Sequence, residues 1–99
     1  MIEHCGILFD WDEAKEAANI AKHGVSFDEA MTAFSDEFAQ IYDDEEHSND
    51  EERFILIGYS EKTRLLMICH CYRDNEVVTR IISARKATRH ERQKYEYGG

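Results

Sequence analysis

The sequence predicts an α+β domain: an N-terminal strand and two helices, then an antiparallel sheet of about four strands, then a C-terminal helix. Three observations support this order. Helix-capping residues follow a short strand-like segment, closely spaced apolar segments occupy residues 53–83, and a capping box opens a last helix near residue 88. Ninety-nine residues suffice for one hydrophobic core but not for two, so we expect a single domain over residues 1–99.

The first elements are a short strand and two helices. Apolar side chains alternate along residues 7–11, which is typical of a strand. Asp12 can cap a helix whose alanines recur at i, i+3, i+4 and i+7, and Gly24 suits the left-handed residue that ends a helix. Ser26 and Glu29 have the spacing of a capping box, which predicts a second helix directly afterwards.

The predicted sheet contains strands at residues 38–42, 53–59, 64–72 and 77–83. Turns of four residues separate the last three strands, which is typical of an antiparallel meander. The stretch 43–52 holds seven acids and no apolar residue, so we expect it to be a solvated loop.

Charge is divided unequally along the chain, whose net charge is −9. Residues 1–52 carry 16 acids and two bases, whereas residues 53–99 carry ten bases and five acids. The overall acidity argues against tight nonspecific binding to duplex nucleic acid. A local basic face can still hold a phosphate, and residues 80–94 contain six Lys or Arg and one Glu. The acidic half suits a basic protein partner.

The cysteines and the apolar segments limit the compartment and the cofactors. Cys69 and Cys71 lie on one face of a predicted strand while His70 points to the other, so we predict reduced thiols and no metal site. No apolar run approaches the length that crosses a bilayer, and no signal peptide is recognised at the N-terminus. We therefore expect a cytoplasmic protein without a membrane partner.

Two stretches together carry a resemblance to a known family. The first is F-D-W-D at 9–12, then Lys15, Asn19 and K-H-G-V-S-F at 22–27. The second is R-I-I-S-A-R-K-A-T at 80–88, followed by matches at 91–92 and 95–96, with further matches at 52–54 and 57–58. From Leu8 to Glu96, the chain resembles the BrnT family of bacterial toxins.

The resemblance implies a RelE-like fold and a ribonuclease toxin that arrests translation. It also implies a BrnA-type antitoxin with a ribbon-helix-helix DNA-binding domain, so that the toxin would reach DNA only through that partner. No cofactor is implied.

RNA cleavage without a metal needs a base for the 2′-hydroxyl, cations for the charge on the phosphate, and an acid for the leaving 5′-oxygen. The residue types and the resemblance together give candidates for these roles. The catalytic candidates are Lys22, His23, Glu52, Arg80, Arg85 and Tyr95, and the substrate-binding candidates are Arg53, Arg64 and Lys86.

Each candidate also has a purely structural interpretation. Arg80 and Arg85 offer planar donor forks for a phosphate, but Arg80 could instead pair with the acidic half. Lys22 and His23 could simply complement the dipole at a helix C-terminus. Tyr95 could stack on a base or donate a proton, but it is also the best apolar anchor of the last helix.

Two classes of function remain open at this point. The first is an endoribonuclease toxin. The second is a non-enzymatic partner that binds a DNA-binding antitoxin and helps it repress, for which the acidic half would provide the docking surface.

Overall fold

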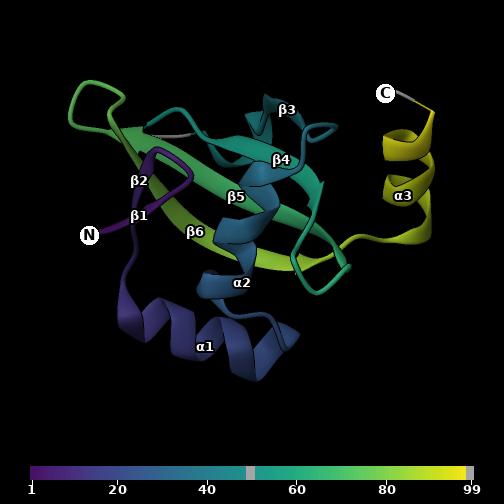
Figure 1. Cartoon of the computed structure of the whole chain (residues 1–99), viewed down its shortest axis with the longest axis horizontal. Helices are drawn as coiled ribbons and strands as arrows, with labels where there is room; N and C mark the ends of the chain where they lie inside the picture. The colour runs from purple at the N-terminus through teal and green to yellow at the C-terminus, as the bar shows by residue number, and fades with distance from the viewer. Residues whose placement is uncertain (49–50, 98–99) are drawn as a thin grey trace.

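The computed structural model describes residues 1–48 and 51–97, and within these ranges it has six strands in one mixed sheet (Figure 1). The elements follow in the order β1 (Ile2–His4), β2 (Ile7–Asp10), α1 (Glu13–His23), α2 (Phe27–Thr32), the 3₁₀ turn η1 (Ala33–Ser35), β3 (Gln40–Asp43), the 3₁₀ turn η2 (Glu45–His47), β4 (Phe54–Tyr59), β5 (Leu65–Arg73), β6 (Val78–Lys86) and α3 (Arg89–Glu96). The α+β class is confirmed. None of the helices in the described ranges is long and apolar enough to cross a membrane.

The expectation of about four strands was wrong, because two N-terminal strands join the sheet. The strand order is β1-β2-β6-β5-β4-β3. Cys5 and Gly6 turn β1 back onto β2 with φ angles of 50° and 81°. β2 then pairs in parallel with β6, which sets Asp10 opposite Arg80. β1 is too short and too exposed to give a periodic signal, and the parallel pair joins residues 70 positions apart.

The predicted caps account for the helix boundaries. The Asp12 carboxylate accepts two backbone N–H groups of the first turn of α1, and Gly24 ends that helix with a φ of 69°. Thr88 and Glu91 form a complete capping box at α3. At α2 only half of the predicted box exists, because Glu29 directs its carboxylate to Arg64 and Ser60 instead.

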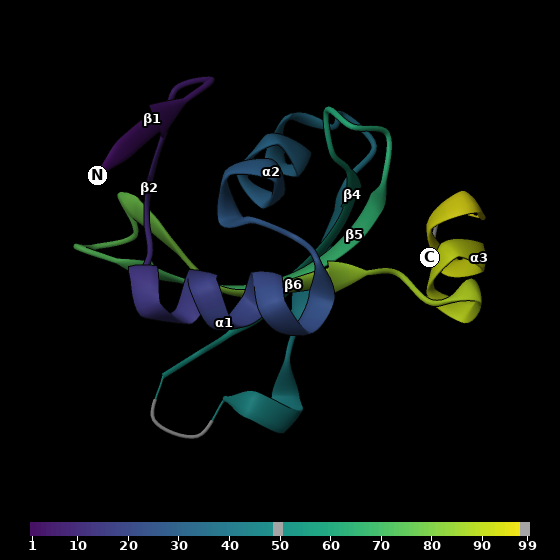
Figure 2. The same ribbon diagram turned by 90° about the horizontal axis from the view of Figure 1, so that it is seen from below.

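The two faces of the sheet are covered unequally. The helix α2 lies on one face, which we call the covered face, while η2 lies on the opposite side of the sheet (Figure 2). The core of the covered face includes Phe9, Phe27, Ala30, Leu56, Ile68 and Ile81. On the opposite face, Ile57, Leu65 and Met67 pack with Tyr95 of α3 at one end. We call this second face the open face. It contains a pocket next to these packed residues.

Candidate active site

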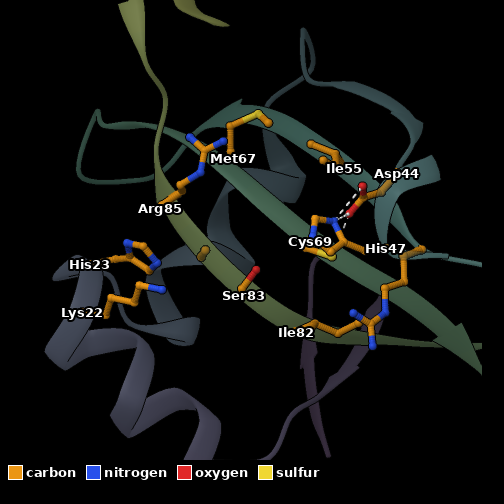
Figure 3. Close-up of a pocket in the computed structure, with 12 residues that line it drawn as sticks. Lys22, His23, Asp44, His47, Ile55, Met67, Cys69, Ile82, Ser83 and Arg85 are labelled. Carbon is orange, nitrogen blue, oxygen red and sulfur yellow. Dashed lines mark hydrogen bonds and ion pairs between the residues drawn. The ribbon is translucent and has the colours of Figure 1, made fainter. Parts of the chain in front are cut away.

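A pocket of about 340 Å³ lies on the open face and collects side chains from five regions of the chain (Figure 3). The end of α1, the η2 segment and the strands β4, β5 and β6 all contribute. The lining residues are Lys22, His23, Asp44, His47, Arg53, Ile55, Met67, Cys69, Ile82, Ser83, Ala84 and Arg85. Four of the residues named from sequence therefore meet in one place: Lys22, His23, Arg53 and Arg85.

A buried asparagine holds the end of α1 against the sheet. The Asn19 amide donates to the carbonyl oxygens of Val25 and Ala84, both at 2.8 Å, and its oxygen accepts from the Ala84 N–H at 3.1 Å. Three hydrogen bonds from one side chain fix α1 beside β6 next to Arg85. Since Lys22 and His23 occupy the last turn of α1, this anchor brings them to the pocket.

Arg85 reaches the pocket from β6 with its guanidinium held by α3. Its two terminal nitrogens donate to the two carboxylate oxygens of Glu91 at 2.8 and 2.9 Å. This bond is the main reason that the pKa of Glu91 falls to about 2. Arg85 Nη1 also donates to the Lys86 carbonyl at 3.2 Å, and the side chain as a whole remains 40% exposed and lines the pocket. The geometry fits a preorganised donor for an anion.

Arg53 enters the pocket just before β4. Its backbone is clamped, because its N–H donates to the Ser48 hydroxyl at 2.9 Å and its carbonyl accepts from the Asp44 N–H at 2.9 Å. Its Nε is buried and finds no hydrogen-bond partner among the residues that the structure describes. Arg53 also lines a small neighbouring cavity together with Arg80, so Arg53 lies between the pocket and that cavity.

The sequence interpretation missed the η2 side of the pocket. The stretch 43–52 was expected to be a solvated loop, but Asp44 is buried and residues 45–47 form a 3₁₀ turn; residues 49–50 lie outside the described ranges. His47 Nδ1 lies 3.0 Å from both carboxylate oxygens of Asp44. The only sequence signal was a histidine three residues after an aspartate within the acidic run.

The strand β5 supplies the pocket with sulfur atoms. Met67 and Cys69 point into it, while His70 points to the covered face, as the alternation of a strand predicted. Burial, and next to it the Asp44 carboxylate, raises the pKa of Cys69 to about 12. The Cys69 thiol therefore keeps its proton and donates to Asp44 Oδ2 at 3.5 Å.

Two of the other candidates are engaged in ion pairs. Arg64 forms a bidentate pair with Glu29, which is only 2% exposed, and also donates to the Gly24 carbonyl. Arg80 pairs with Asp10 at 3.0 Å, the residue opposite it in the parallel β2–β6 pair. Neither arginine lines the pocket.

The remaining candidates also lie elsewhere. The Tyr95 hydroxyl donates to Asp36 at 2.7 Å, and its ring packs edge-on against Tyr59. Burial raises the pKa of Tyr95 to about 12, so the phenol stays protonated. Glu52 lines a separate shallow hollow, and Lys86 is exposed outside the pocket.

Comparison with known proteins identifies the family. The family model described as "Ribonuclease toxin, BrnT, of type II toxin-antitoxin system" matches residues 11–91. The crystal structure of the Brucella abortus ribonuclease toxin BrnT has the same fold: a TM-score of 0.63 and 24% sequence identity over 84% of this chain and 99% of that chain. A search of curated proteins found no match. The chain belongs to the BrnT family of ribonuclease toxins of type II toxin–antitoxin systems.

Proposed function

We propose that this toxin is a metal-independent endoribonuclease whose active site is the pocket on the open face. The observation that carries the proposal is the convergence there of Lys22, His23, Arg53 and Arg85 from three separate parts of the chain. Three cations and one imidazole supply the charges and the proton-transfer group that cleavage of an RNA phosphodiester requires.

The roles follow from the chemistry of the reaction. The 2′-oxygen attacks the adjacent phosphorus, the phosphate gains charge, and the 5′-oxygen leaves, which gives a 2′,3′-cyclic phosphate and a 5′-hydroxyl. Arg85 presents a guanidinium held by Glu91, Arg53 presents a second guanidinium, and Lys22 adds a flexible ammonium group. His23 transfers a proton, because an imidazole ring can both donate and accept one.

The proposal extends to the cellular system. In this scheme the enzyme adopts the RelE-like mode of action, cleaves RNA in the cytoplasm and thereby stops translation. A ribbon-helix-helix antitoxin of the BrnA type neutralises it and carries the complex to DNA. Residues 1–52 carry 16 acids, which favours a partner whose contacting segment is basic, since acidic groups attract cations.

A decisive experiment measures cleavage of single-stranded RNA by the purified protein in EDTA, beside an Arg53→Ala variant. We expect metal-free cleavage by the wild type and a loss of about 10²-fold in the variant. The matched control is Arg89→Ala, which removes an exposed arginine on α3 from outside the pocket. Equal losses in the two variants would refute the proposed site, and dependence on added metal would refute the mechanism.

The acidic half also supports the second candidate, a non-enzymatic co-repressor. The two functions separate in cells. A ribonuclease toxin arrests growth when expressed alone and stops doing so after Arg53→Ala, whereas a co-repressor causes no arrest in either form.

A further inference from the structure

The η2 side of the pocket contains a histidine and a carboxylate that the proposed mechanism has not used. Asp44 is held from both sides along its backbone. Its N–H donates to the Arg53 carbonyl at 2.9 Å, and its own carbonyl accepts from the Ser48 hydroxyl at 2.7 Å. The side chain is only 6% exposed, so its carboxylate has a fixed place at the edge of the pocket.

This carboxylate determines which nitrogen of His47 carries a proton. Both oxygens of Asp44 lie 3.0 Å from His47 Nδ1, and a carboxylate only accepts hydrogen bonds. Nδ1 is therefore the protonated nitrogen in the neutral ring, and Nε2 keeps its lone pair. The His47 side chain is 61% exposed, so Nε2 can be reached by a substrate in the pocket.

The two histidines of the pocket face it from opposite sides. Figure 3 shows His23 at the end of α1 and His47 beside Asp44, with Ser83 of β6 between them. Cleavage by the 2′-hydroxyl needs a base on one side of the phosphorus and an acid on the other, because the attacking and leaving oxygens are in line. In Figure 3 the two rings lie on either side of Ser83, so one ring is available for each of these roles.

A simple surface ion pair explains these contacts less well. Exposed ion pairs contribute little to the stability of a fold, and burying a carboxylate costs free energy. Asp44 nevertheless is buried and accepts from both His47 and the Cys69 thiol. A buried acid that orients an exposed imidazole stabilises the positive charge that forms when the imidazole takes a proton.

We infer that His47 is the general base of this ribonuclease, that Asp44 is its positioning residue, and that His23 is the general acid. The assignment rests on the proposed ribonuclease function. His47 Nε2 takes the proton of the 2′-hydroxyl while the 2′-oxygen bonds to phosphorus. The bond from phosphorus to the 5′-oxygen breaks, and that oxygen takes the proton from His23.

The test separates the base from the acid by changing the leaving group. Four 2′-O-methyl oligonucleotides each contain a single ribonucleotide, one for each base, so that only one linkage can react. A second set replaces the leaving 5′-oxygen of that linkage with sulfur. A thiolate leaves without help from an acid, because a thiol is far more acidic than an alcohol.

We expect His47→Gln to lower kcat at least about 10²-fold on both sets, because both need the 2′-proton removed. His23→Gln should lose a similar factor on the oxygen set and recover most of the wild-type rate on the sulfur set. Asp44→Asn should lower kcat about 10-fold or more with little change in KM, since the ring loses its orienting charge. His90→Gln, an exposed histidine on α3, is the matched control.

The outcomes divide clearly. An active wild type whose His47→Gln variant keeps its rate, or recovers on the sulfur set, overturns the assignment and leaves the proposed ribonuclease standing. A wild type that cleaves neither set overturns both. His47 is largely exposed and glutamine keeps an N–H donor for the buried Asp44, so this substitution should leave the fold intact. Thermal unfolding shows whether Asp44→Asn is folded. If Asp44→Asn does not fold, the His47→Gln result alone decides whether the assignment holds.

Discussion

The covered and open faces of the sheet use the same residue types for different ends. On the covered face, Arg64 forms an ion pair with the buried Glu29, and His70 lies fully buried among aromatic rings. On the open face, Arg85 and His47 are also held by carboxylates, but their outer atoms line a pocket. Under the proposed function, a partner carboxylate does not by itself mark a charged group as structural. What decides is whether a substrate can reach the group.

The largest effect that this comparison predicts is on Arg85→Ala. Removing a fixed donor to the phosphate should lower the rate of RNA cleavage about 10²- to 10³-fold. The measurement is the initial rate in EDTA. Glu91→Gln is the control, because it frees the guanidinium without removing it and should keep far more activity. A fully active Arg85→Ala variant would show that the open face is not the active site.

Arg64→Ala should affect stability rather than catalysis. The substitution leaves Glu29 buried without its partner, which should lower the free energy of unfolding by about 3 kcal/mol. Urea unfolding measures this loss, and the cleavage rate per folded molecule should not change. A variant of normal stability that cleaves RNA poorly would place Arg64 in the active site instead.

His70 should make the fold sensitive to acid. Burial lowers its pKa from 6.5 to about 4, so between these values the unfolded chain binds a proton that the folded chain does not. Stability is therefore lost as the pH falls from 6.5 to 4, by about 3 kcal/mol in total. Glutamine does not titrate, so in the His70→Gln variant the urea midpoint of unfolding should fall less between pH 6.5 and pH 4 than it does in the wild type. Identical slopes for the two proteins would contradict the buried neutral histidine.

Arg80→Ala should have the smallest effect. Asp10 already pairs with Arg80, and both side chains are partly exposed, so unfolding should become easier by only about 1 kcal/mol or less. Cleavage should change by no more than a few-fold, measured in the same assay. A loss as large as that of Arg85→Ala would mean that the substrate extends over the neighbouring cavity.

Local signals allowed much of the fold to be predicted. The caps at Asp12, Gly24 and Thr88 are short-range patterns, and each marks a boundary that the structure contains. The parallel pairing of β2 with β6 was not predictable, because no local pattern connects Asp10 with Arg80. That pairing also explains why Arg80, which the sequence made a leading candidate, is engaged with an acid beside it.

The candidate site could be predicted from the sequence only in part. The residue types of Lys22, His23 and Arg85 indicated phosphate chemistry, but their meeting point depends on Asn19, whose hydrogen bonds to Ala84 link residues 65 positions apart. The burial of Asp44 was not predicted, because a run of acidic residues usually indicates a solvated segment. Its burial arises from tertiary contacts with Arg53 and Cys69 that composition does not reveal.

The central claim, that RNA binds on the open face, can be tested by NMR. A non-cleavable 2′-O-methyl RNA is titrated into the isotope-labelled protein while the backbone amide signals are followed. The account predicts that the largest shifts cluster at His23, Arg53 and residues 82–85, with little change along α2. Shifts concentrated on α2, or on the shallow hollow at Glu52, Phe54 and Tyr72, would contradict it.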